Sequence, residues 1–289
     1  MSYRDPFAPQ LLIDVGNTRS KWRVQNGNGS VIAAGSSSGT LETLPENIAA
    51  TISPAFAVFL ASGSPSTPSS TLPSTVAAGE SKQAAQLARC KVALVRDDTQ
   101  KALLEQALRQ VFGCEVAFAK TQSHSHGIVN SYADPSSMGV DRWCAILAAA
   151  HASHIPGGNN DICIVDAGSA VTIDWVDRNG KHLGGYITPG YAMQVRELLS
   201  GTGRVFATES APEHEIAPGD TTQLAVHNGI LASIVAHIEM SIERHRRAGG
   251  AAPQLYLSGG DAGTIAKHLD TPCEIREELV LDGLALLLP

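Results

Sequence analysis

Two segments of the sequence combine an aspartate, a glycine and hydroxyl side chains directly after an apolar run. They are Asp14-Val-Gly-Asn-Thr18 and Asp166-Ala-Gly-Ser169, which lie about 150 residues apart. A tight turn of this kind presents backbone N–H groups that can bind phosphate, and Lys21 follows close behind the first turn. Because an aspartate would repel phosphate directly, its natural role in such a turn is to hold a hydrated Mg²⁺ ion.

Either turn alone is equally compatible with an ordinary β-hairpin. The recurrence of the whole pattern is more specific, since each aspartate ends an apolar strand and precedes a strand of alternating polar and apolar residues. An internal repeat at this scale indicates two duplicated domains, each of which presents an acidic turn to a shared cleft.

The segment Gly139-Val-Asp-Arg142 is a third candidate, because it opens a strongly apolar helix. In one interpretation, Asp141 and Arg142 form a cap and an ion pair that hold the helix N-terminus. In the other, they place a general base beside an anion-binding arginine, since arginine recognises carboxylates through a forked pair of hydrogen bonds. The residues alone favour the structural interpretation.

The elements that must position these groups alternate between strands and helices. The first half begins with a β-hairpin at 11–24 and continues to about residue 128. Its further elements are expected to be a strand at 30–34, a helix at 41–52, strands at 55–61 and 91–95, helices at 81–87 and 99–111, and a strand at 115–119. This alternation after an initial β-meander predicts an α/β sheet with mixed strand pairing. We therefore place two domains at 1–128 and 129–289.

The second half repeats the opening strand–turn–strand design and then also alternates between helices and strands. They are expected to be two strands within 161–177, a strand from 182 to the Pro189-Gly190 turn, a helix at 191–199, an amphipathic helix at 223–246, a strand at 254–257 and a helix at 278–288. Asp220-Thr-Thr222 is expected to cap the long helix. The glycine turn Ser258-Gly-Gly260 would let a ligand approach the backbone closely.

The composition excludes several classes of partner. The formal net charge is −7 and no Lys/Arg-rich run occurs, which argues against a nucleic acid or an anionic membrane as partner. No apolar run approaches the ~20 residues of a membrane span, and the N-terminal residues lack the pattern of a signal peptide. The five scattered cysteines have no Cys-x-x-Cys spacing and fit a reduced, cytoplasmic setting. His124 and His126, in a polar loop, are not expected to bind metal.

The motifs together resemble those of type III pantothenate kinases, in the same order and over nearly the whole chain. They are Asp14-Val-Gly-Asn-Thr-Arg-Ser-Lys21, Gly139-Val-Asp-Arg142, Asp166-Ala-Gly-Ser169, Gly184-Gly-Tyr-Ile-Thr-Pro-Gly190, Thr222 with Asn228-Gly-Ile230, and Ser258-Gly-Gly260. That family belongs to the acetate and sugar kinase/Hsp70/actin superfamily. The resemblance implies an α/β fold of two RNase H-like (actin-like ATPase) domains. Each would be a mixed sheet flanked by helices, with the active site in the cleft between them.

The implied activity is ATP-dependent phosphorylation of pantothenate to 4'-phosphopantothenate, the first step of coenzyme A biosynthesis. By the resemblance, Asp141 is the general base that takes the proton from the pantothenate hydroxyl. The residues implied to bind ATP are Asp14, Val15, Gly16, Asn17, Thr18, Arg19, Ser20, Lys21 and Ser169. Those implied to bind pantothenate are Tyr132, Gly139, Val140, Asp141, Arg142 and Thr222.

The resemblance also implies cations and a second copy of the chain. Asp166 matches the ligand of a monovalent cation, K⁺ or NH₄⁺, and Asp14 would hold Mg²⁺ directly or through water. Family members are homodimers that bind pantothenate near the subunit interface. These roles agree with the chemistry of phosphoryl transfer, which needs an aligned nucleophile, neutralised phosphate charge and an acceptor for the hydroxyl proton. The resemblance therefore moves Asp141 and Arg142 from the structural interpretation to the catalytic one.

Two features depart from the family pattern. Ser169 stands where the family usually has threonine, and it keeps the hydroxyl group. The segments 62–75 and 151–160 are longer than in the compact pattern and are expected to be surface insertions. Two alternatives also stay open: another small-acid or sugar kinase of the superfamily, and a non-catalytic transcription-accessory relative. A pure regulator would not need the intact Asp14, Asp141-Arg142 and Asp166.

Overall fold

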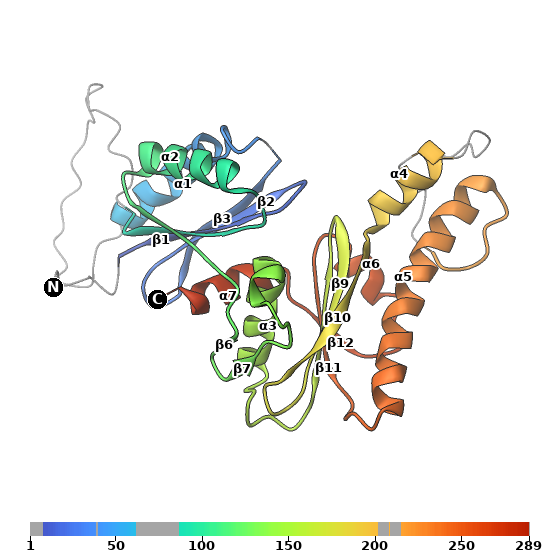
Figure 1. The fold of residues 1–289 in the computed structure, drawn as a ribbon. Coiled ribbons are helices and arrows are strands. Elements are labelled where there is room, and N and C mark those ends of the chain that lie inside the picture. The colour runs from blue at the N-terminus through green and yellow to red at the C-terminus, as the bar shows by residue number, and fades with distance from the viewer. Residues whose placement is uncertain (1–7, 39, 62–86, 202–207, 209–214, 289) are drawn as a thin grey trace. The chain divides into compact units, whose positions relative to one another are not determined.

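The computed structural model describes residues 8–38, 40–61, 87–201, 208 and 215–288. The chain forms two compact units, with the boundary after Ala119 and with Leu288 belonging to the first unit (Figure 1). The sequence placed this boundary after residue 128, which lies within the short hairpin of β6 (His124–Ser125) and β7 (Ile128–Val129) that the structure assigns to the second unit.

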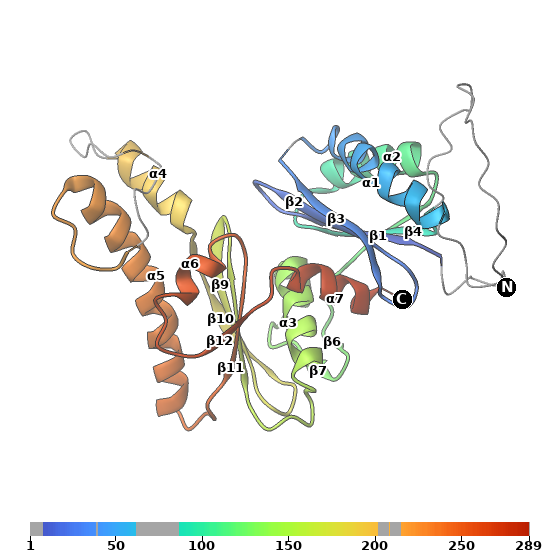
Figure 2. The same ribbon diagram turned by 180° about the vertical axis from the view of Figure 1, so that it is seen from behind.

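The first unit is built on a five-stranded sheet with the order β3-β2-β1-β4-β5. Strands β1, β2 and β3 form an antiparallel meander, whereas β4 and β5 run parallel to β1. The strands are β1 (Gln10–Val15), β2 (Ser20–Gln25), β3 (Val31–Ser37), β4 (Arg89–Leu94) and β5 (Glu115–Phe118). Helices α1 (Leu44–Ala61) and α2 (Asp98–Phe112) lie together over one face of this sheet (Figures 1 and 2).

The apolar pattern of the first unit explains this layering. In β1, Leu11, Ile13 and Val15 share a face by the two-residue period of a strand, and they join one buried core with residues of both helices. Helix α2 has clear ends, because the Asp97 side chain accepts a hydrogen bond from the Gln100 N–H and Gly113 closes the helix in the left-handed conformation.

The second unit repeats the same sheet, with the order β10-β9-β8-β11-β12 and the same strand directions. The strands are β8 (Ile162–Ala167), β9 (Ala170–Val176), β10 (His182–Pro189), β11 (Gln254–Ser258) and β12 (Cys273–Ile275). The other elements are η1 (Pro135–Ser137), α3 (Val140–Ala152), α4 (Tyr191–Gly201), α5 (Thr222–Arg247), α6 (Ala262–Ala266) and α7 (Leu279–Leu287). Helices α3 and α7 cover one face of the sheet, and α5 and α6 lie on the other (Figures 1 and 2).

The repeated sheet confirms the fold class expected from the sequence, two RNase H-like units that each contain a mixed sheet with flanking helices. The two acidic turns occupy the same place in each unit, between the first and second strands of the meander. Helix α5 is long and apolar enough to cross a membrane by length and composition alone. Half of that stretch is buried, because its apolar side packs into the core of the second unit, as in a globular protein.

The expected strand at 55–61 is wrong, because α1 continues to Ala61. Alanine is the best helix former, and a short apolar run does not distinguish a strand from a buried helix. Pro54 disfavours a helix interior, yet the helix passes through it. The expected loop at 62–75 and all of the expected helix at 81–87 except Leu87 lie outside the described residues. The segment 151–160 ends α3 and forms a loop that is largely exposed except at Ile155.

Candidate active site

The first acidic turn, between β1 and β2, borders an open cavity of about 380 Å³ in the first unit. Six of the residues predicted to bind ATP line it, namely Val15, Gly16, Asn17, Thr18, Arg19 and Ser20. Arg96 also lines the cavity, and its guanidinium donates a hydrogen bond to the Asn17 carbonyl of the turn at 3.4 Å. The cavity therefore combines a tight backbone turn with two arginines and one carboxylate, Glu42, and this excess of positive charge suits an anion.

Asp14 and Lys21 are opposite each other in the pairing of β1 with β2. Side chains at directly opposed positions of an antiparallel pair share a face, so this carboxylate and this ammonium group are neighbours at the mouth of the turn. Gly16 is required here, because a Cβ atom at this position would lie 2.6 Å from the Arg19 carbonyl oxygen. The predicted stretch from Asp14 to Lys21 is thus one continuous turn with its two flanking strand ends.

The second acidic turn is enclosed by two glycine segments that the sequence singled out separately. The Gly190 N–H donates to the Ser169 carbonyl at 3.0 Å, and a Cβ atom on Gly190 would lie 2.0 Å from the Gly168 carbonyl oxygen. Gly259, at φ +92°, approaches Ala167 so closely that a Cβ atom would lie 2.2 Å from its carbonyl oxygen. Asp166, half-buried at the end of β8, is thus surrounded by packed backbone.

Asp141 lies in the first turn of α3, one residue inside the helix, and Gly139 is the N-cap. One carboxylate oxygen, Oδ1, accepts a hydrogen bond of 2.7 Å from the Arg142 N–H. Burial raises the pKa of the Asp141 carboxyl group, and the negative charge of Asp174 acts in the same direction, whereas the Arg142 N–H and guanidinium lower it. Among the described residues, the second oxygen, Oδ2, has no hydrogen-bond partner.

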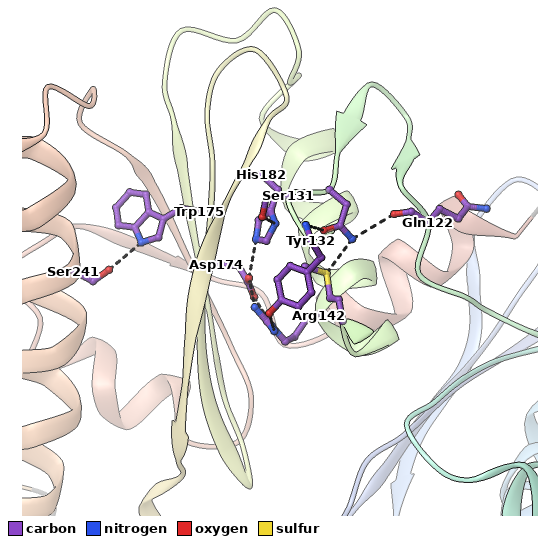
Figure 3. A network of polar contacts seen from close by, with 10 residues as sticks. Gln122, Ser131, Tyr132, Arg142, Asp174, Trp175, His182 and Ser241 are labelled. Atoms are coloured by element: carbon purple, nitrogen blue, oxygen red, sulfur yellow. Dashed lines mark hydrogen bonds and ion pairs between the residues drawn. The ribbon is translucent and has the colours of Figure 1, made fainter. Parts of the chain in front are cut away.

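The Arg142 side chain points into the interior of the second unit, where it forms a buried ion pair (Figure 3). Its Nε and Nη2 atoms donate to the two carboxylate oxygens of Asp174 in β9, at 2.9 and 2.6 Å, and Nη1 donates to the Tyr132 hydroxyl at 2.9 Å. Burial alone would lower the pKa of Arg142, but the hydrogen bonds to Asp174 and Tyr132 raise it above its ordinary value. The guanidinium therefore stays charged, and its forked edge is used by a carboxylate of the protein.

Thr222 is separate from this network. It is exposed in the first turn of α5, and the neighbouring Thr221 caps the helix by accepting a hydrogen bond from the Leu224 N–H at 3.2 Å. The Thr222 side chain makes no hydrogen bond with any other described residue. The predicted pantothenate residues thus divide into a connected group, Tyr132 with 139–142, and an exposed threonine at a helix start.

The implied cations were tested against the donor atoms present. No cluster of three or more His, Cys, Asp and Glu residues that could hold a metal occurs among the described residues. A monovalent cation does not need such a cluster, since one carboxylate with backbone carbonyl oxygens suits a hard cation, and the carbonyl groups of 167–169 follow Asp166 directly in this turn. Asp14, at the end of β1 and opposite Lys21, offers the carboxylate oxygens that hydrated Mg²⁺ prefers. The residues fit both ions.

Sequence reasoning missed Asp174, His182 and Ser131, which complete the network around Arg142. Asp174 is 2% exposed and His182 is fully buried. The available signals were a lone carboxylate between Ile173 and Trp175 in an apolar strand, and a histidine two residues before Gly184 of the Gly184-Gly185 pair. A charge in the middle of a buried strand needs a partner, so it indicates a specific contact.

Comparisons with known proteins agree with the geometry. A family model described as type III pantothenate kinase matches residues 10–244. A type III pantothenate kinase of Marinobacter nauticus (strain ATCC 700491 / DSM 11845 / VT8) is 34% identical over 277 residues, 95% of this chain and 96% of its own. That of Cellvibrio japonicus (strain Ueda107) is 31% identical over 278 residues, 95% of this chain and 94% of its own.

Solved structures show a likeness in fold. A crystal structure of a conserved putative Baf family transcriptional activator from Campylobacter jejuni superposes with a TM-score of 0.55 at 19% sequence identity. The superposition covers 95% of this chain and 94% of the other. At this identity the likeness supports the fold alone.

Proposed function

Because this chain belongs to the type III pantothenate kinase family and is therefore a pantothenate kinase of coenzyme A biosynthesis, we propose specific roles for its predicted site residues. ATP and pantothenate are its substrates. The roles concern phosphate binding, proton removal from the acceptor hydroxyl, recognition of the pantothenate carboxylate, and charge neutralisation by cations.

The turn from Gly16 to Ser20 binds the ATP phosphates through its backbone N–H groups and hydroxyls. Lys21, Arg19 and Arg96 supply positive charge in a protein whose net charge is −7, so the phosphates are attracted by local groups and not by the surface as a whole. Asp14 holds hydrated Mg²⁺, which neutralises phosphate charge when it is bound with ATP. Ser169 contributes a hydroxyl to the nucleotide from the second turn.

Asp141 is the general base, and the single observation that carries this role is the arrangement of its carboxylate. Oδ1 is held by the Arg142 N–H at 2.7 Å, while Oδ2 has no partner among the described residues and remains available to accept a proton. Burial raises the pKa of this carboxyl group, which makes its ionised form a stronger base.

Arg142 binds the carboxylate of pantothenate through N–H groups that the protein does not use. A guanidinium has five N–H donors, and Asp174 and Tyr132 accept from three of them, which leaves one N–H on each Nη atom. Those two donors can accept one substrate carboxylate. Tyr132, the backbone of 139–141 and Thr222 complete the pantothenate site.

The remaining expectations also belong to this proposal. Asp166 and the carbonyl oxygens around it bind K⁺ or NH₄⁺. The protein works in the cytoplasm as a homodimer, in which Thr222 completes a pantothenate site near the subunit interface. These roles rest on the family pattern and on the donor atoms at Asp166.

The kinetics of two variants test these roles. ADP release is measured with pantothenate, Mg-ATP and K⁺ for the wild type, Asp141→Asn, Arg142→Gln and the control Arg246→Gln, whose side chain pairs with Glu243 on the surface. We expect Asp141→Asn to lower kcat, Arg142→Gln to raise the KM for pantothenate, and the control to change neither. A normal kcat in Asp141→Asn would refute the assignment of the base, and a normal KM in Arg142→Gln would refute the carboxylate site.

A further inference from the structure

A chain of buried hydrogen bonds extends from Arg142 away from the predicted substrate atoms. Asp174 Oδ1, which accepts from Arg142, also accepts from His182 Nε2 at 3.0 Å, and His182 Nδ1 bonds the Ser131 hydroxyl at 2.9 Å (Figure 3). A carboxylate only accepts hydrogen bonds, so the Nε2 atom of His182 carries a proton. His182 and Arg142 thus both donate to Asp174, and the hydrogen bonds converge on this carboxylate.

The strand geometry places Asp174 on the α3 side of the second sheet. The next residue, Trp175, points to the opposite side, where its indole N–H donates to Ser241 of α5 at 2.9 Å (Figure 3). Asp174 therefore lies on the face of the sheet that packs against the first turn of α3, where it contacts the side chain of Arg142. The meeting point is buried, with side-chain exposures of 6% for Arg142 and 3% for Asp174.

The backbone around this ion pair is adapted to it. Gly185 of β10 is paired with Asp174 of β9, and a Cβ atom on Gly185 would lie 2.6 Å from Asp174 Oδ1 and 3.1 Å from Arg142 Nη2. The same atom would lie 2.2 Å from the Ile173 carbonyl oxygen. A glycine is thus needed where the guanidinium and carboxylate pass over the edge strand.

Stability alone is a poor explanation for this arrangement. Removing two charges from water costs several kcal/mol per ion, and buried ion pairs are often no more stabilising than apolar side chains of similar volume. The pair does, however, fix the plane of a guanidinium whose long side chain otherwise has many rotamers. A fixed plane determines where the two remaining N–H groups point.

We propose that Asp174, His182 and Gly185 act as positioning residues that hold Arg142 so that its free N–H groups receive the pantothenate carboxylate. Asp174 fixes the plane through two hydrogen bonds, His182 and Ser131 fix Asp174, and Gly185 provides the space. This inference rests on the proposed role of Arg142 in substrate binding.

Steady-state kinetics at saturating Mg-ATP and K⁺ test the proposal. The variants are Asp174→Asn, Ser131→Ala, Arg142→Gln and the double variant Arg142→Gln/Asp174→Asn. The matched control is Asp161→Asn, which removes another buried carboxylate of the second unit, directly before β8, that is paired with a histidine, His245, at 2.8 Å. Circular dichroism and thermal unfolding establish the folded fraction of each variant.

We expect Asp174→Asn to raise the KM for pantothenate about tenfold or more, because the charge opposite the Arg142 guanidinium is lost and an amide offers one acceptor oxygen where the carboxylate offers two. In the Arg142→Gln background the same change should raise the KM by less than about a further twofold, since the effects of residues that act through one another are not additive.

In Asp174→Asn the acid limb of the pH profile of kcat/KM should also move to lower pH. The charged groups acting on Asp141 are Arg142 and Asp174, and loss of the Asp174 charge lowers the pKa of the Asp141 carboxyl group. Asp161→Asn should change neither KM nor the pH profile.

A KM in Asp174→Asn within about twofold of the control, or equal effects with and without Arg142, would overturn the inference. If Asp174→Asn does not fold, the KM of Ser131→Ala tests the positioning role instead, because Ser131 is exposed and can be replaced without disturbing the core. Loss of its one hydrogen bond to His182 should raise the KM for pantothenate about threefold. An unchanged KM there would overturn the inference. If Arg142→Gln itself leaves KM unchanged, the proposed carboxylate site fails, whereas a raised KM in Arg142→Gln with a normal Asp174→Asn refutes the positioning role alone.

Discussion

The substitution Asp141→Asn should lower the activity of the protein and, at neutral pH, raise its stability. Asparagine has the same shape, and its carbonyl oxygen can still accept the hydrogen bond from the Arg142 N–H. It cannot accept a proton from the substrate hydroxyl, so we expect turnover to fall ~100-fold or more. It also removes a buried charge, so the folded protein should become no less stable and, at neutral pH, more stable.

The sign of the stability effect follows from the direction of the pKa shift. Burial raises the pKa of Asp141 in the folded protein above its unfolded value. Folding therefore favours the protonated form, and the stability from this group is fully present below the unfolded pKa and is lost as pH rises through the folded pKa. Asparagine is neutral at every pH, so its advantage should be absent in acid and should grow toward neutral pH.

Each pKa unit between the folded and unfolded states corresponds to about 1.4 kcal/mol in the free energy of unfolding. For a domain of the size of the second structural unit, a change of 1 kcal/mol in the free energy of unfolding shifts the melting temperature by about 2–4 °C. Chemical denaturation of the wild type and Asp141→Asn at several pH values therefore measures the shift directly, alongside the turnover of both proteins.

A matched substitution, Asp161→Asn, should give the opposite result. Burial acts to raise the pKa of Asp161, but hydrogen bonds from the Arg178 N–H, His245 and the Ala251 N–H lower it overall. Its stability contribution is therefore present above the unfolded pKa and is lost as pH falls through the folded pKa. We expect a loss of about 1–3 kcal/mol at neutral pH with kcat unchanged. An Asp141→Asn variant that is destabilised at neutral pH, or that turns over normally, would refute the reasoning.

Three further changes give outcomes that are simple to measure. Replacing K⁺ with Na⁺ in the ADP-release assay should lower activity, because the smaller ion fits a carbonyl-rich site differently; equal rates in both salts would argue against a selective site at Asp166. Gly283→Ala should lower the free energy of unfolding by about 1–3 kcal/mol, since the added Cβ atom would lie 1.8 Å from the Cys144 carbonyl oxygen where α7 packs against α3. An unchanged melting curve would contradict this packing. Gly190→Ala should abolish activity with a smaller effect on folding, because the added atom meets the carbonyl oxygens of Gly168 and Ser169; retained activity would show that the second turn tolerates displacement.

The sequence allowed much of this architecture to be predicted, for reasons that are local. The apolar strands ending at Asp14 and Asp166 carry their own periodicity, and the glycine turns after them are short-range signals. Helix α5 was predicted at 223–246 and runs from Thr222 to Arg247, because its cap and its apolar face both lie within the segment itself. The error at 55–61 arose where an apolar alanine-rich run offers no period that separates strand from helix.

The network around Arg142 could not be predicted in the same way. Arg142 and Asp174 are 32 residues apart, and their contact depends on α3 packing over β9. Local patterns indicate which face a strand buries, but they do not indicate which polar residue of another element meets it there. The structural and catalytic interpretations of Asp141-Arg142 were posed as alternatives, whereas Arg142 forms a buried ion pair that still leaves two N–H groups for a ligand.

The two acidic turns share a design, yet their surroundings suit ligands of opposite charge. The first turn is open, and Arg19 and Arg96 line the cavity beside it, so its exposed N–H groups can face an anion. The second is closed by Gly190 and Gly259, which lie against the carbonyl oxygens of 167–169, so a carboxylate there has further oxygen atoms around it. Backbone dipoles that present oxygen favour a cation, and those that present N–H groups favour phosphate. We therefore expect the same Asp-x-Gly pattern to suit phosphate in the first copy and a cation in the second, because the glycine contacts around the two turns differ.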